Sequence, residues 1–420
     1  MSWNPPEPAP AKRSPAVPIV IAVVVTALIA GGLTWFVMRD DDNDNAASST
    51  TTTRRETTTP DTSEGGNEDD PLSSLDDLLG GDAGDLGGLL GGNIDAMSKC
   101  VGADDMSSLL GGGDPLPDTD PRTQYQEIAQ RVEEERGLTF DHVPEPVFVD
   151  SQEMQSRVER QIEADYPADA AQADEELYKA LGVIDDDTNL LDEYSKFVGS
   201  QVAGYYDPDT GELVVLGDDT EPFDALEMTT IAHELEHALA DQKLGFPIED
   251  TPVAADEDKQ MAGLALIEGD ATLTMTRFQL SAVDLMSLLG SLGGAGLDAQ
   301  TKALEDAPRY FASQLMFPYT EGLGFVCTLE ADGGWPAVDD AYENAPTTTA
   351  QIMFPDRYTS GEGAVAVPDP QSPGDGWEHV RTTTFGAAEL MFLLQDAFVN
   401  EPRDRAAAWA GGKVSQWRNG

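Results

Sequence analysis

The chain has 420 residues, of which 24 are Lys or Arg and 78 are Asp or Glu, so its formal net charge is -54. Proteins that bind nucleic acid neutralise phosphates with clustered Lys and Arg, and the acidity of this chain therefore excludes a nucleic-acid partner. The hydrophobic fraction of 40% supplies a sizeable core. The length leaves room for one large domain or two smaller ones, plus additional segments.

An uncharged apolar stretch near the N-terminus predicts a transmembrane helix at residues 17–38, because a helix needs about 20 apolar residues to cross a bilayer. Lys12 and Arg13 precede this stretch and Arg39 follows it, so the basic residues favour residues 1–16 as a cytoplasmic tail. We expect a single-pass protein of the cell membrane whose bulk is extracytoplasmic. The alternative is a cleaved signal peptide, but no small-x-small cleavage site follows the apolar stretch closely.

Residues 39–120 are acidic and rich in Ser, Thr and Gly, a composition that predicts a disordered linker. Within it, residues 71–120 alternate Leu pairs with Gly and Asp, and a role as a pro-segment that covers a cleft stays open. The composition becomes globular near residue 121, so residues 121–420 are the expected folded domain. The two cysteines, Cys100 and Cys327, are too few for a disulfide framework. One bond between them fits a compartment outside the cytoplasm and stays open.

The first third of the expected domain shows mostly helical patterns. Helices are expected at residues 123–136, 151–164, 173–181 and 190–198. Residues 146–150 (PVFVD) predict a short strand, and residues 203–217 predict a β-hairpin. The turn of that hairpin is Asp-Pro-Asp-Thr-Gly, with Gly211 where a positive φ is needed.

The segment TTIAHELEHALADQ, residues 229–242, carries the pattern H-E-x-x-H at His233, Glu234 and His237. Residues four apart share one face of a helix, so the two imidazoles lie about one turn apart. In this pattern two His bind zinc, and the Glu acts on water at the metal. The motif is more specific here than a loose match, because the chain contains only 4 His.

Two His leave a catalytic zinc one protein ligand short. Downstream, residues 261–275 (MAGLALIEGDATLTM) have the pattern of an apolar helix interrupted by acidic residues. A carboxylate buried on such a face is costly unless it is paired or bound to a metal, so Glu268 is the expected third ligand. Asp270 is the rival, and it fits better as an acceptor for the N–H of a ligand His. Gly269 would let another helix approach closely.

The remaining polar residues of the zinc helix have their own expected roles. Asp224 is placed to cap its start, and Gly245 to end it. Asp241 lies one turn past His237 and is expected either to accept a hydrogen bond from a ligand His or to be solvated at the helix end. Glu236 is expected to point away from the His face into solvent.

His233, Glu234 and His237, followed by Glu268 in an E-G-x-A setting, resemble the gluzincins, the thermolysin-like zinc metallopeptidases. The resemblance implies Zn²⁺ as cofactor, a peptide or protein substrate and a zincin-like fold. Together with the predicted elements it gives an α+β fold, with a small β-sheet over the active-site helix and a mainly helical half after it. It also implies that residues 213–216 bind an extended peptide by strand addition.

The resemblance implies a mechanism in which zinc lowers the pKa of water and Glu234 takes its proton, then delivers it to the leaving amine. The oxyanion needs a second donor. Tyr319 is the expected one, with Tyr205 and Tyr206 as alternatives. The function is therefore expected to be that of a membrane-anchored metallopeptidase whose other partner is the lipid bilayer.

Two other functions stay open. One is a catalytically inactive zincin-fold binding protein of the cell envelope, against which the intact Glu234 argues. The other is a zinc amide hydrolase that is not a peptidase, similar to the deformylases. That class takes its third ligand from Cys, and neither Cys of this chain has a suitable setting.

Overall fold

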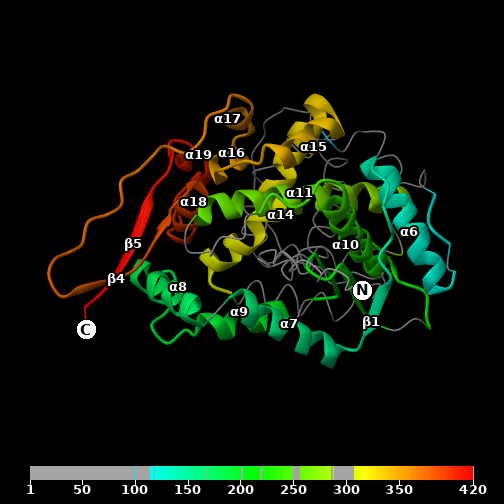
Figure 1. Ribbon diagram of the computed structural model, residues 1–420, viewed down its shortest axis with the longest axis horizontal. Coiled ribbons are helices and arrows are strands. Elements are labelled where there is room, and N and C mark those ends of the chain that lie inside the picture. The colour runs from blue at the N-terminus through cyan, green and yellow to red at the C-terminus, as the bar shows by residue number, and fades with distance from the viewer. Residues whose placement is uncertain are drawn as a thin grey trace, which may run out of the picture.

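The structure is a computed structural model that describes residues 100, 114–117, 119–166, 168–199, 202–217, 220–248, 256–284, 287 and 307–419. These residues combine a small sheet, a separate two-stranded ribbon and many helices in an α+β arrangement (Figure 1). The expected membrane helix at residues 17–38 and the tail before it lie outside the described residues. Within the described part of the chain, no helix has the length and apolarity needed to span a bilayer.

The described elements up to α11 follow the expected order. Up to the first long helix pair they are α6 (Pro121–Arg136), β1 (Pro146–Val149), α7 (Ser151–Asp165), α8 (Ala168–Leu181), α9 (Leu190–Gly199), β2 (Gly204–Asp207), β3 (Glu212–Leu216), α10 (Ala225–Lys243) and α11 (Glu257–Ala282). The later ones are α14 (Arg309–Gly333), α15 (Trp335–Glu343), α16 (Thr349–Met353), α17 (Pro355–Thr359), β4 (Trp377–Thr384), α18 (Ala387–Asp396), α19 (Pro402–Ala406) and β5 (Lys413–Asn419). The four helices, the strand and the hairpin expected before the H-E-x-x-H segment are confirmed.

The three-stranded sheet has the order β1-β3-β2 and lies against α10, which contacts both β2 and β3. β2 runs antiparallel to β3 across the hairpin, and β1 runs parallel to β3. Gly211 has a φ of 70° in the turn, as expected. The expectation that residues 213–216 add a substrate strand is wrong, because β3 is central and both of its edges are already paired. The edge strand of the hairpin is β2.

The zinc-motif helix α10 begins and ends where the sequence predicts. The Asp224 side chain accepts hydrogen bonds from the backbone N–H of Leu226 and Glu227, both at 2.9 Å. The Glu227 side chain accepts one from the Asp224 N–H at 2.8 Å, which completes a capping box. At the other end Gly245 has a φ of 72° and bonds back to the Ala240 carbonyl.

Helices α11 and α14 cross with their backbones in direct contact. A Cβ built on Gly322 of α14 would lie 2.1 Å from the Ala265 carbonyl oxygen of α11. A Cβ built on Gly269 would lie 2.3 Å from the Gly322 carbonyl carbon. The close approach expected at Gly269 is confirmed. Because Glu268 precedes Gly269, this crossing also fixes where the Glu268 side chain lies.

Gly322→Ala is expected to lower the free energy of unfolding by about 3 kcal/mol. The added methyl group would clash with the backbone of α11, and relieving the clash requires the two helices to move apart. Chemical denaturation measures the change. The matched control is Gly263→Ala on α11, where the nearest atoms to a Cβ are 3.6 and 3.7 Å away. That control gains helix propensity and should be neutral or slightly stabilising. Equal stability of the two variants would contradict the packing described.

The folded domain includes residues that precede position 121. Cys100 is helical and buried, and it forms a disulfide with Cys327 of α14, with 5.0 Å between the two Cα atoms. The Leu116 N–H donates to the Ala282 carbonyl at 2.9 Å. The disulfide left open by the sequence is therefore present in the structure. The rest of the possible pro-segment lies almost wholly outside the described residues.

Candidate metal centre

Three buried side chains meet where α10 and α11 pack together. His233 and His237 come from α10 and Glu268 from α11, and none is more than 1% exposed. The two Nε2 atoms are 3.1 Å apart. The Glu268 Oε2 atom lies 3.3 Å from the His233 Nε2 and 3.4 Å from the His237 Nε2. The structure thus brings together all three of the metal ligands expected from the sequence.

The spacing of these three atoms fits a single metal ion. Ligand atoms at zinc distances of about 2.0–2.1 Å in tetrahedral geometry lie about 3.4 Å from one another. The observed separations of 3.1, 3.3 and 3.4 Å are close to this value. Three such ligands form one face of a tetrahedron and leave the fourth position for water or substrate. The group could therefore hold a metal ion.

The electrostatics of the site keep Glu268 ionised. Burial alone would raise its pKa, but His237 and hydrogen bonds from both histidines outweigh burial and lower the pKa to about 2. An ionised carboxylate is the form that binds a metal. Asp270, the rival ligand, lies outside the group and is instead ion-paired with Arg136 at 2.8 Å. The choice of Glu268 over Asp270 is therefore supported.

Glu234 is fully buried beside the ligands, and its two carboxylate oxygens have different surroundings. Oε2 accepts a hydrogen bond from the backbone N–H of Tyr206 at 2.9 Å. Oε1 has no hydrogen-bond partner among the described residues. Burial raises the pKa of Glu234 to about 7, a range in which a carboxyl group both accepts and releases a proton readily.

Asp241 holds the edge strand against α10. The Tyr206 hydroxyl donates to the Asp241 Oδ2 at 2.8 Å. Asp241 is partly exposed at the end of α10, as one of the two expectations has it, but it bonds to Tyr206 and not to a ligand His. Tyr206 therefore contacts α10 twice, through its hydroxyl at Asp241 and through its amide at Glu234.

A buried cluster of polar residues lies next to His237 and consists of Glu236, Arg136, Asp270 and Tyr342. Glu236 is 0% exposed, so the expectation that it is solvated is wrong. Its Oε2 lies 3.9 Å from the His237 Nδ1, and its Oε1 lies 3.8 Å from the Arg136 Nε. The Tyr342 hydroxyl completes the cluster by donating to Asp270 at 3.0 Å. Burial, followed by the charge of Asp270, raises the pKa of Glu236 well above its ordinary value.

Arg136→Met is expected to lower the free energy of unfolding by about 3–5 kcal/mol, because it leaves Asp270 without its buried counter-charge. Chemical denaturation of the metal-free protein measures the loss. Arg122→Met, at an exposed position of the same helix α6, is the matched control and should change stability by less than about 1 kcal/mol. A small effect at Arg136 would contradict the buried ion pair.

Tyr319 of α14 lies beside the metal ligands. Its ring centroid is 6.3 Å from that of His233, and its hydroxyl is buried with the rest of the side chain and interacts with Glu268. Burial, followed by the charges of Glu268 and Glu234, raises the pKa of Tyr319 well above its ordinary value, so its hydroxyl stays protonated. The two alternative donors have other partners. The Tyr206 hydroxyl bonds to Asp241, and Tyr205 interacts with Arg157.

Comparisons with known proteins identify no family for this chain. No protein-family model, no curated protein and no solved structure matches it. Its function is therefore inferred from the chemistry of its own residues.

Proposed function

We propose that this chain is a membrane-anchored, extracytoplasmic zinc metallopeptidase of the gluzincin type. The observation that carries the proposal is the buried group of His233, His237 and Glu268, whose three ligand atoms are 3.1–3.4 Å apart. Glu234 lies beside this group, and one of its oxygens has no hydrogen-bond partner among the described residues. Two imidazoles, a carboxylate and an adjacent acid are the parts that metal-assisted hydrolysis needs.

The donor set favours zinc over the other common divalent cations. Calcium and magnesium prefer shells made of oxygen atoms, whereas a site with two imidazoles and one carboxylate is a catalytic zinc set with an open position. When bound, zinc lowers the pKa of water and polarises a carbonyl group. Two polar atoms are available to a substrate next to it: the Glu234 Oε1, which has no hydrogen-bond partner among the described residues, and the Tyr319 hydroxyl.

The residues around the metal group divide the chemical work between them. The Tyr206 N–H holds one oxygen of Glu234, so that the other oxygen is left to take a proton and return it to the leaving amine. The Tyr319 hydroxyl can donate to the carbonyl oxygen of the substrate as negative charge develops there. These roles assign Glu234 and Tyr319 as the catalytic residues of the proposed reaction.

A peptide substrate is supported by the position of β2. This strand is at the edge of the sheet, and the Tyr206 N–H on its outer side already bonds to Glu234. An extended peptide added to this edge would lie along the base. Peptide binding by strand addition, which the resemblance implied for residues 213–216, is therefore proposed for β2, residues 204–207, instead.

The proposed location rests on two features. Residues 17–38 are apolar enough to anchor the chain in a membrane. The disulfide between Cys100 and Cys327 fits an oxidising compartment, because cytoplasmic reductants keep thiols reduced. Both support a catalytic domain outside the cytoplasm.

Incubation of the full-length chain in detergent with an unfolded polypeptide tests the activity. We expect cleavage that a chelator stops and that added zinc restores. Cleavage at an unchanged rate in the presence of the chelator, or no cleavage of any polypeptide, would overturn the proposal. Hydrolysis of small amides alone would favour the non-peptidase hydrolase, and zinc binding without any hydrolysis would favour the inactive binding protein.

A further inference from the structure

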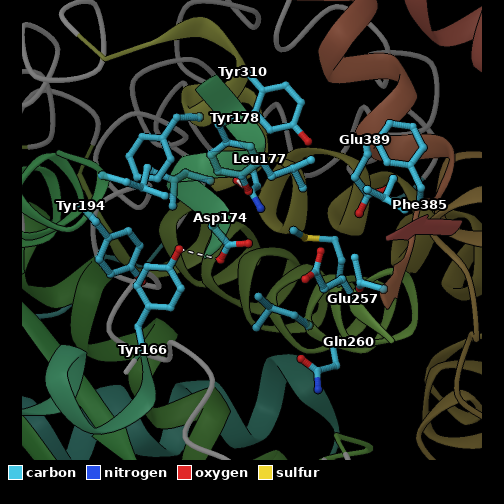
Figure 2. Close-up of a pocket in the computed structure, with 18 of the residues that line it drawn as sticks. Tyr166, Asp174, Leu177, Tyr178, Tyr194, Glu257, Gln260, Tyr310, Phe385 and Glu389 are labelled. Atoms are coloured by element: carbon cyan, nitrogen blue, oxygen red, sulfur yellow. Dashed lines mark hydrogen bonds between the residues drawn. The ribbon is translucent and has the colours of Figure 1, made fainter. Parts of the chain in front are cut away.

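A cavity of about 180 Å³ lies between α8, α9, α11 and α14, close to β4 and α18 (Figure 2). Its wall is unusually rich in rings, contributed by Tyr166, Tyr178, Tyr194, Tyr310, Phe311 and Phe385. The remaining wall is mostly aliphatic. A cavity of this volume holds one long side chain or a small molecule, and not a folded segment.

This cavity begins about one helical turn from the metal centre. Leu264 lines it and lies four residues before Glu268 on α11, and Leu315 lines it four residues before Tyr319 on α14. Four residues of helix correspond to a rise of about 6 Å. The cavity and the metal group therefore lie about one turn apart along both helices.

Three carboxylates, those of Asp174, Glu257 and Glu389, point toward the middle of the cavity (Figure 2). None of the described lining residues is Lys, Arg or His. Arg381 pairs with two of the acids, with its Nη1 atom 3.3 Å from Glu257 and its Nη2 atom on Asp174. Among the described residues Glu389 has no cationic partner, and its carboxylate accepts the Gly386 N–H at 2.8 Å in the capping box of α18. The cavity is therefore short of positive charge.

The electrostatics of Glu389 agree with an absent cationic group. Burial, followed by the charge of Asp258, raises the pKa of Glu389 to about 8. A carboxyl group with such a pKa lacks the opposite charge that would stabilise its ionised form.

A metal ion does not fit the cavity. In the described residues only His233, His237 and Glu268 bring three ligand atoms within 4.8 Å of one another. The carboxylates of the cavity are thus too far apart to surround one ion. Aromatic faces together with carboxylates instead match an organic cation on an apolar stem, through cation–π contacts and charge-assisted hydrogen bonds.

We propose that this cavity binds the side chain of a lysine or arginine of the peptide substrate, near the scissile bond. Glu389 pairs with the cationic end, and the rings of Tyr194, Tyr310 and Phe311 pack along the stem. This inference rests on the proposed peptidase activity for its link to cleavage, whereas the binding of the cation itself does not depend on it.

The cleavage test uses the full-length chain and two peptides that differ at one position, Lys or its uncharged analogue norleucine. The wild type should show a higher kcat/KM for the lysine peptide. In Glu389→Gln that preference should fall about tenfold or more, as for the loss of a charged hydrogen bond, while the amide oxygen still accepts the Gly386 N–H. Glu163→Gln, at an exposed position of α7, is the matched control and should keep the preference.

The binding test separates this inference from the proposed function. Nuclear magnetic resonance measures the binding of N-acetyl-lysine methylamide and its norleucine analogue to the wild type and to Glu389→Gln. Lysine-selective binding that Glu389→Gln removes supports the cavity assignment even if no peptide is ever cleaved. The assignment is overturned if the wild type cleaves the lysine and norleucine peptides equally well and binds the two probes equally. The peptidase proposal would still stand in that case.

Discussion

Glu234→Gln is expected to lower the rate of peptide cleavage by about 10²–10⁴-fold, the range set by loss of a general acid–base group, while the metal stays bound. The Gln side chain has nearly the same shape, and its oxygen still accepts the Tyr206 N–H that Glu234 accepts at 2.9 Å. It cannot take up and release a proton as a carboxylate does. The ligands His233, His237 and Glu268 are unchanged, so the variant should carry as much zinc as the wild type.

Two measurements on the same samples check this expectation, the zinc content by mass spectrometry and the cleavage of an unfolded polypeptide. Glu221→Gln, at an exposed position just before α10, is the matched control and should cleave at the wild-type rate. Retained cleavage in Glu234→Gln would refute the role of the base. Loss of zinc in that variant would mean that Glu234 supports the metal group and not the chemistry.

Glu268→Ala is expected to weaken zinc binding by more than about 100-fold, beyond what is lost with a residue that only supports a ligand. It removes one of three ligands and leaves two buried imidazoles 3.1 Å apart with no carboxylate between them. Cleavage should be lost together with the metal. Competition with a chromogenic chelator gives the affinity of each variant for zinc.

The control for this prediction is the other acid of α11, Asp270, which the sequence offered as a rival ligand. Asp270→Asn should keep a zinc affinity far above that of Glu268→Ala. It should instead lower the free energy of unfolding, because Arg136 loses the carboxylate that lies 2.8 Å from it. A reversed pattern, with zinc lost in Asp270→Asn and kept in Glu268→Ala, would exchange the roles of the two acids.

Local signals in the sequence were enough to predict most elements near the site. Asp224 and Glu227 form a capping box within four residues of chain, and the Gly211 turn closes a hairpin of neighbours. Strand order depends on partners far apart in sequence, since β1 at residues 146–149 pairs with β3 at residues 213–216. One signal pointed to a central place for β3, because the unbroken apolar run LVVL at residues 213–216 is typical of a strand covered on both faces.

The three residues of the candidate metal group were predictable for two different physical reasons. His233 and His237 are linked by helical spacing, whereas Glu268 stood out as an acid in an apolar helix. The error at Glu236 came from assuming a solvated face on α10, although every residue from Met228 to Ala240 of that helix is buried. Arg136 gave no usable signal, because a basic residue in the last turn of a helix is ordinarily solvated.

X-ray absorption at the zinc edge on the full-length chain tests the metal centre most directly. We expect one zinc per chain, four-coordinate, with two imidazoles and oxygen ligands at about 2.0–2.1 Å. In His233→Ala and His237→Ala this signal should disappear. A spectrum with sulfur ligands, or zinc retained in both of those variants, would contradict a metal centre built on α10 and α11.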